Sequence, residues 1–113
     1  MKLTANRFEN ETYKCLECNE VIESENVNRE TWKCNRCKEK IVIGIGEKSG
    51  MLIRIRPNEV RQYDSVFDQY DRVFLEVKGD PFDCGEYYYI PVAGHGKVKV
   101  VANDFVNCMW RMD

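Results

Sequence analysis

Four cysteines arranged in two pairs constrain this chain more than any other feature. Cys15 and Cys18 form one Cys-x-x-Cys pair, Cys34 and Cys37 form a second, and fifteen residues separate the pairs. This spacing is typical of a site in which four thiolates bind one metal ion. Two cysteines separated by two residues can direct both sulfur atoms at one ion, and two such turns complete the tetrahedron that zinc accepts. We therefore predict one bound zinc ion.

Two alternatives use the same cysteines. A redox dithiol needs its Cys-x-x-Cys at the start of a helix in a strand-helix-strand setting, and neither pair has that setting. Iron bound by four thiolates has the same ligand pattern and stays open. In either metal site, four protein thiolates leave no coordination position for water or substrate, so we expect a structural ion and not a catalytic one.

The segments YKCLECNE and TWKCNRCKE, which contain the two pairs, resemble the zinc-ribbon family. The resemblance covers residues 13–40 only, and it implies that two facing hairpins present the paired cysteines. The commonest family form has Pro after the first cysteine of a pair and Gly after the second. Here those places hold Leu16 and Asn19 in the first pair, and Asn35 and Lys38 in the second. Zinc-ribbon families often serve in transcription, translation or DNA processing, so the resemblance implies a nucleic-acid-associated role.

The charge balance argues against a dedicated nucleic-acid binder. The formal net charge is -2, and neither the part before the boundary at Lys40 nor the part after it has a basic excess that could neutralise phosphates. The first residues, MKLTANRFENETYK, contain no apolar run of the kind that a secretory signal needs, and no stretch approaches membrane-spanning length. We expect a cytoplasmic protein, since a reducing compartment keeps thiols free for metal binding.

The apolar pattern changes at Lys40 and predicts two domains. Residues 1–40 are polar around the cysteines and form the expected zinc ribbon, whereas residues 41–113 form a small β-rich domain. Residues 41–45 and 51–56 alternate as strands of one hairpin around the turn EKSG, and residues 86–92 and 97–102 form another. Further strands are expected at residues 73–77 and 104–110, with Pro91 at an edge or a bulge. The predicted fold is mainly β, α+β at the margin, with a small antiparallel sheet or barrel.

One short helix is the exception to this β pattern. Residues 58–71 carry apolar side chains at spacings of three and four, and Pro57 with Asn58 resembles a helix start. The aspartates in the segment are mediocre helix formers, and two short strands joined by turns are the alternative. We predict the helix at about residues 58–71.

A candidate binding surface follows from the residue types on the predicted strands. Basic residues on strand faces beside tyrosines could bind single-stranded nucleic acid, and exposed tyrosine pairs are typical of protein-binding surfaces. The alternative interpretation of the basic residues is that they form the solvated face of an amphipathic sheet. The alternative interpretation of the tyrosines is that they pack against neighbouring strands within the sheet. The candidate residues are Arg54, Arg56, Tyr87, Tyr89, Lys97 and Lys99.

No catalytic constellation is evident in the sequence. His95 lies between two glycines and indicates a tight turn, and nothing in the spacing brings it to Cys84 or Cys108 as a nucleophile pair. We therefore expect no enzyme. The leading hypothesis is a zinc-binding module that acts as an adaptor or inhibitor through protein-protein contacts. The alternative is a nucleic-acid-associated factor that uses the ribbon and a local basic face.

Overall fold

The computed structural model of the chain describes residues 1–46 and 50–111, which form a mainly β protein without an α-helix. The described residues contain two single turns of 3-10 helix, η1 (Ser24–Asn26) and η2 (Pro57–Glu59). None of the described helices is long and apolar enough to cross a membrane. The chain forms two compact units. The cysteine unit comprises Arg7–Arg54 with the residues from Trp110 on, and the larger unit comprises Met1–Asn6 and Ile55–Met109.

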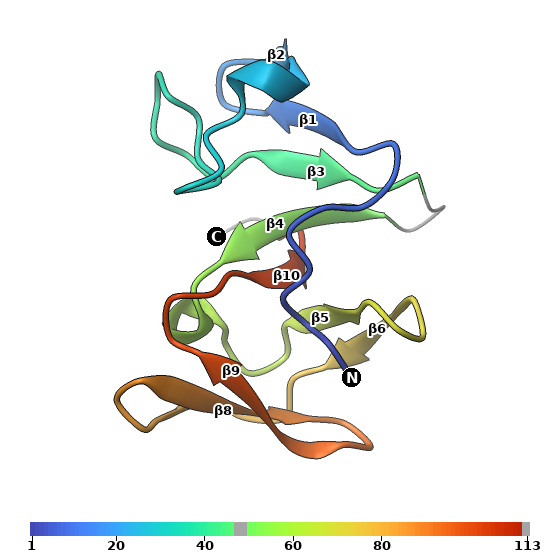
Figure 1. Ribbon diagram of the computed structural model, residues 1–113, viewed down its shortest axis with the longest axis vertical. Helices are drawn as coiled ribbons and strands as arrows, with labels where there is room; N and C mark the ends of the chain where they lie inside the picture. The colour runs from blue at the N-terminus through green and yellow to red at the C-terminus, as the bar shows by residue number, and fades with distance from the viewer. Residues whose placement is uncertain (47–49, 112–113) are drawn as a thin grey trace. The chain divides into compact units, whose positions relative to one another are not determined.

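The cysteine unit contains four antiparallel strands in the order β2-β1-β3-β4 (Figure 1). They are β1 (Thr12–Cys15), β2 (Glu20–Ile22), β3 (Val42–Gly44) and β4 (Met51–Ile55). The predicted hairpin of β3 and β4 is confirmed by the pairing of Ile43 with Leu52. Residues 47–49 of its expected turn, EKSG, lie outside the described residues. Gly44 suits its place in β3, because a Cβ atom there would lie 2.5 Å from the Thr12 hydroxyl oxygen in β1.

The boundary between the units differs from the predicted one after residue 40. β3 belongs to the cysteine unit because it pairs with β1 along its whole length, from Val42 to Gly44. Ile41, Val42 and Ile43 are all buried, so this strand is covered on both faces and forms the core of the unit. The apolar run that sequence reasoning assigned to the second domain is therefore what the polar, cysteine-bearing segment packs against.

The larger unit contains two groups of antiparallel strands, in the orders β10-β5-β6 and β7-β8-β9. Figure 1 labels these strands except β7. Their bounds are β5 (Ser65–Asp68), β6 (Val73–Glu76), β7 (Phe82–Asp83), β8 (Tyr87–Val92), β9 (Gly96–Val101) and β10 (Val106–Met109). The predicted strands at residues 73–77, 86–92, 97–102 and 104–110 are thus confirmed. A bridge between Val77 and Val92 connects the two groups, and both residues are fully buried.

The segment before the cysteine unit returns to the last strand of the larger unit. The side chain of Asn107 in β10 donates to the backbone carbonyls of Leu3 and Ala5, at 3.4 and 2.7 Å. The Asn107 backbone N–H also donates to the Leu3 carbonyl, at 2.9 Å. Asn107 is completely buried, and these bonds satisfy polar groups that would otherwise be costly there.

The predicted helix at residues 58–71 is wrong. After the single turn η2, the backbone is extended at Val60, turns at Tyr63 with φ of 74°, and then enters β5. The physical reason lies in the aspartates: the Asp64 carboxylate accepts the N–H of Arg61 at 2.8 Å, which holds a tight turn and competes with helical hydrogen bonds. The spacing of apolar residues arises here from a turn and a buried strand.

Two smaller expectations are also corrected. The described strands of neither unit close into a barrel, since β7 and β9 remain the outer strands of their group. Pro91 lies neither at an edge nor at a bulge but within β8, the middle strand, opposite Lys97. Its carbonyl accepts the N–H of Lys78 at 2.9 Å, and its missing N–H costs β8 no bond to β9 because the Pro91–Lys97 pair is one of the non-bonded pairs of the ladder.

Candidate metal centre

The four paired cysteines lie together at two tight turns of the cysteine unit. Cys15 is the last residue of β1, and the N–H of Cys18 points back at the Cys15 sulfur, 3.4 Å away. In the second turn, the N–H of Lys38 donates to the Cys34 carbonyl at 2.9 Å. Each turn therefore folds back on its own first cysteine and presents both sulfurs on one side.

Asn19 and Lys38 complete these turns in the left-handed conformation. Their φ angles are 53° and 65°, in the region that favours glycine. These are the two positions at which the commonest zinc-ribbon form has glycine. The sequence places residues there that tolerate this backbone less well, and the turns form nonetheless.

The sulfur atoms of Cys15, Cys18, Cys34 and Cys37 are positioned to hold one metal ion. All four lie within 4.8 Å of one another, with 3.5 Å between Cys15 and Cys37 and 3.9 Å between Cys18 and Cys34. A tetrahedron of thiolates with metal–sulfur bonds of about 2.3 Å has sulfur–sulfur edges of roughly 3.8 Å. A disulfide would need about 2.0 Å, so the geometry fits an ion and not a cross-link.

The electrostatics of the site favour thiolates at one cysteine and hinder them at another. Backbone N–H groups of Cys37 and Arg36 point at the Cys34 sulfur and lower the pKa of that thiol to about 7. Hydrogen bonding with the Cys15 and Cys37 sulfurs raises the pKa of Cys18 to about 12. Four thiols so close together cannot all ionise without a positive charge among them, which is the charge that a bound metal ion supplies.

The other candidate residues for chemistry are separate from this centre. Cys84 is exposed in the loop before β8, and Cys108 is buried in β10. His95 lies in the exposed turn between β8 and β9, where its backbone N–H donates to the Val92 carbonyl. Among the residues that the structure describes, the four paired cysteines are the cluster of cysteine, histidine and acidic side chains that could hold an ion.

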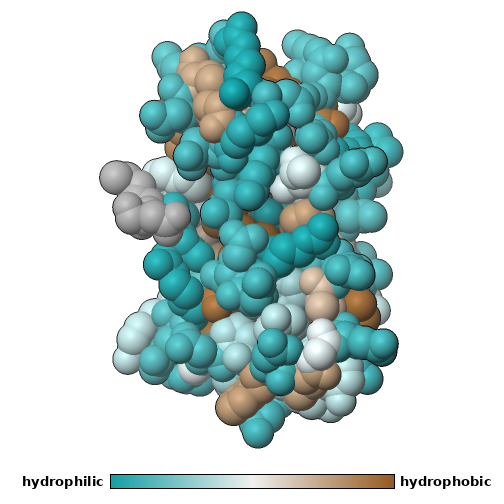
Figure 2. All heavy atoms as spheres, turned by 90° about the vertical axis from the view of Figure 1, so that its left-hand side faces the viewer, coloured by the Kyte–Doolittle hydropathy of each residue, from teal (hydrophilic) through white to brown (hydrophobic). Residues whose placement is uncertain are grey.

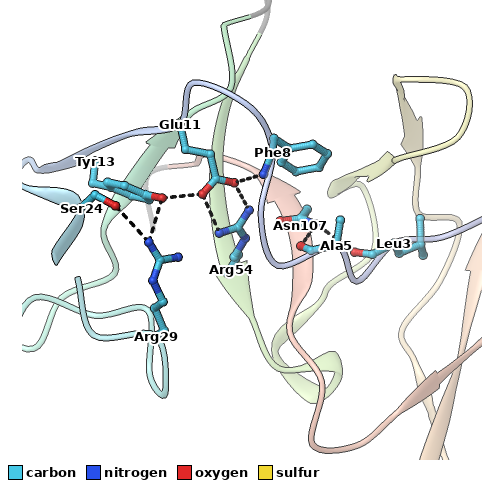
Figure 3. Close-up of polar contacts among 9 residues, drawn as sticks. All are labelled: Leu3, Ala5, Phe8, Glu11, Tyr13, Ser24, Arg29, Arg54 and Asn107. Carbon is cyan, nitrogen blue, oxygen red and sulfur yellow. Dashed lines mark hydrogen bonds and ion pairs between the residues drawn. The ribbon is translucent and has the colours of Figure 1, made fainter. Parts of the chain in front are cut away.

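Arg54 does not lie on an exposed basic face as the sequence suggested. It is 1% exposed, and its guanidinium forms two bonds with the Glu11 carboxylate, at 2.5 and 3.3 Å (Figure 3). The same carboxylate accepts the Tyr13 hydroxyl at 2.6 Å and the Phe8 backbone N–H at 2.7 Å. Glu11 is the partner that sequence reasoning missed, and the signal for it was an arginine inside the apolar run MLIRI.

This buried pair braces the second cysteine turn. The Arg54 guanidinium lies 4.3 Å from the centre of the Trp32 ring, a cation–π contact between two buried side chains. Trp32 is two residues before Cys34, and its carbonyl accepts the Ile41 N–H at 3.2 Å. Figure 3 also shows Arg29 bonded to the Tyr13 hydroxyl and to Ser24. The charge of Arg54 is thus used inside the unit.

Arg56 also has partners within its own unit. Its guanidinium lies over the Phe105 ring at 4.0 Å and donates to the Asn103 carbonyl. Of these two arginines, Arg54 is buried and Arg56 is half-buried, and both have partners within the protein.

Tyr87, Tyr89, Lys97 and Lys99 are brought together on one side of the β7-β8-β9 sheet. The strand register places Tyr89 between Phe82 in β7 and Lys99 in β9, and it places Tyr87 beside Val101. Side chains alternate across a sheet, so these residues share one face while Ile90, Val92 and Val100 fill the core from the other. We name this the aromatic face, and it comprises Phe82, Tyr87, Tyr89, Lys97, Lys99 and Val101.

The aromatic face is held together by ring and cation contacts. The Tyr87 and Tyr89 rings meet edge to face at 5.4 Å, the Lys99 Nζ lies 4.2 Å from the centre of the Tyr87 ring, and the Lys97 Nζ lies 4.5 Å from that of Phe82. Phe82 is 49% exposed and Val101 51%. On the side of the protein seen in Figure 2, hydrophilic atoms prevail and hydrophobic ones form small separate groups.

Comparison with known proteins adds no relative. No protein-family model matches the chain, and no match was found among curated proteins or among solved structures.

Proposed function

We propose that this chain is a non-enzymatic binding module, an adaptor or inhibitor that acts through contacts with another protein, and that its thiolates hold one structural zinc ion. The observation that supports the protein-binding role is the aromatic face. On this face Phe82 and Val101 are exposed and Tyr87 and Tyr89 are half-buried, while Ile90, Val92 and Val100 on the other face of the sheet are buried. Aromatic rings that remain accessible on a surface give contact area at a low cost in conformational entropy.

The zinc assignment is supported by the donor set and its spacing. Four thiolates at tetrahedral distances suit zinc, and iron is the other metal with this preference. We propose that residues 13–40 are a zinc ribbon, because the first cysteine pair lies at the turn between β1 and β2 and the second lies in a turn closed by the Lys33–Lys40 bridge. With all four positions taken by sulfur, the ion has a structural role, in a reducing compartment such as the cytoplasm.

The same surface also makes nucleic acid the second candidate, since lysines beside aromatic rings are what single strands bind. Two observations favour protein over nucleic acid. Arg54 is buried against Glu11, which removes one cation of the proposed basic face. Lys97 and Lys99 cover ring faces on which bases would stack.

Affinity capture with the zinc-loaded protein tests this function. We expect one stoichiometric protein partner, with binding that falls at least tenfold when Tyr87 and Tyr89 are both changed to Ala. Val21→Ala is the matched control, because Val21 is exposed apolar surface in the other unit, and it should bind as the wild type does. Micromolar, strongly salt-dependent binding to single-stranded DNA or RNA, lost in a Lys97→Glu, Lys99→Glu double variant and without a protein partner, would favour the second candidate.

A further inference from the structure

β9 leaves one of its edges unpaired over most of its length. It is the last strand in the order β7-β8-β9, it has six residues, and its side chains at Lys97, Lys99 and Val101 are exposed. Long unpaired edges offer a row of backbone donors and acceptors to any further strand. Most proteins keep such edges short.

The hydrogen-bond phase of the hairpin shows which residues of β9 face outward. Pairs in an antiparallel ladder alternate between bonded and non-bonded. The Ala102 N–H donates to Glu86 at 2.9 Å, so the neighbouring pair of Tyr87 and Val101 is non-bonded, as is every second pair from there. The residues of β9 whose backbone N–H and C=O groups point away from β8 are therefore Val101, Lys99 and Lys97. Pro91 fits its non-bonded position opposite Lys97 because proline has no N–H to donate.

These outward groups are available along the strand. The Val101 carbonyl is used by the N–H of Asp104 at 3.0 Å, whereas no described residue pairs with the backbone N–H or C=O of Lys97 or Lys99. A further strand laid along β9 would therefore meet two consecutive outward residues with both of their backbone groups unused.

A groove runs beside this edge. One wall is formed by Val98 to Val101 of β9, and the other is formed by the first four residues of the chain, with Tyr70 and Asp104 also lining it. Tyr70 is 67% exposed. The groove gives an added strand a place for alternate side chains, which is what provides specificity when strands are added to a sheet edge.

The charges of the groove select the occupant. Lys2 and Lys99 are exposed among the residues that line it, Lys97 is exposed two residues before Lys99 on the same strand, and Asp104 is the one carboxylate in the lining. A second copy of β9 would set lysine against lysine, and like charges on neighbouring strands are destabilising. A strand with acidic residues at alternate positions would instead place them beside Lys97 and Lys99.

We infer that the protein binds its partner by strand addition, with an extended acidic segment of the partner pairing with the outer edge of β9. This deepens the proposed function and rests on it. The partner's acidic side chains lie over the aromatic face beside Lys97 and Lys99, and the alternate, apolar side chains enter the groove beside Tyr70.

Backbone amide signals in a titration of the zinc-loaded protein test the inference directly. The probe is a capped eight-residue peptide of alternating glutamate and valine, and the control peptide has lysine in place of each glutamate. We expect the amide signals of Lys97 and Lys99 to shift and their hydrogen exchange to slow, while those of Val98 and Val100, already bonded to β8, change less. Binding should weaken severalfold as salt rises, and the lysine peptide should not bind.

A pair of substitutions separates the backbone from the side chain. Lys99→Pro removes the outward N–H together with the charged side chain and breaks no bond to β8, whereas Lys99→Ala removes the charged side chain and its contact with Tyr87 but keeps the N–H. We expect Lys99→Pro to weaken peptide binding about tenfold or more, and Lys99→Ala about threefold. Equal effects of the two variants would overturn strand addition. If Lys99→Pro does not fold, the exchange of the wild-type Lys97 and Lys99 amides decides the question alone.

The remaining outcomes distinguish this inference from the proposed function. If a captured protein partner depends on Tyr87 and Tyr89 but not on the Lys99 N–H, the adaptor role stands and strand addition fails. If an oligothymidine shifts the same amides and binds Lys99→Pro as well as the wild type, the edge serves nucleic acid and both proposals fail.

Discussion

The Arg54 guanidinium and the Glu11 carboxylate form a two-bonded ion pair across 43 residues of sequence, with side chains that are 0% and 2% exposed. Removing one member of a buried pair leaves the other charged and unpaired, which typically costs about 3–5 kcal/mol. We expect Glu11→Gln to lower the stability of the cysteine unit by that order, measured by denaturant unfolding of the zinc-loaded protein followed by Trp fluorescence.

The exposed pair of Arg36 and Glu20 in the same unit is the matched control, since its atoms are also close, at 2.8 Å. Water screens exposed pairs strongly, so Glu20→Gln should leave the unfolding midpoint unchanged within error. A similar loss in both variants would show that the Arg54–Glu11 pair has no special role.

Metal content is the second prediction. The wild type should contain one equivalent of zinc by elemental analysis, and Cys34→Ser should lose it together with the ordered signals of the cysteine unit, because so short a site folds largely through metal-binding energy. Cys84→Ser should retain both, since Cys84 is exposed and lies outside the cluster. A well-folded cysteine unit without metal would contradict the proposal.

The left-handed turn at Lys38 gives a third prediction. Glycine adopts φ near 65° without steric cost, so Lys38→Gly should keep or raise stability by up to about 1 kcal/mol. Lys38→Val should lower it by about 1–2 kcal/mol, because a β-branched residue is strongly disfavoured there. Thermal unfolding of the zinc-loaded variants measures both, and the reverse order would place the strain elsewhere.

Acid should destabilise the larger unit through Asp68. Burial alone would raise the pKa of this carboxyl, but the backbone N–H groups of Tyr70 and Lys2 donate to it at 3.0 and 3.2 Å and help to hold the pKa below its usual range. A group with a lowered folded-state pKa contributes stability above its unfolded value, near 4, and loses that contribution as pH falls through the folded value. The β5 amide signals should report this loss, and Asp68→Asn should remove the pH dependence.

The sequence predicted what local patterns determine. Paired cysteines at a fixed spacing, alternating runs and glycine-containing turns identified the ligand set and the strands from residue 73 on. The position of Arg54 could not be predicted, since an arginine in a strand is exposed unless a distant acid such as Glu11 meets it. The helix prediction failed for a related reason. The Asp64 carboxylate holds a turn by accepting a backbone N–H that a helix would use, and the spacing of apolar residues contains no information about such a bond.

The bonds from Asn107 to Ala5 and Leu3 set the order in which this protein can mature. They join residues 102 and 104 positions apart, with the segment Arg7–Arg54 of the cysteine unit between them. During synthesis, residues 3–5 leave the ribosome about a hundred residues before their partner exists. The four paired cysteines all lie in Arg7–Arg54 and can therefore come together before β10 is made, whereas the larger unit can close only after β10 is released.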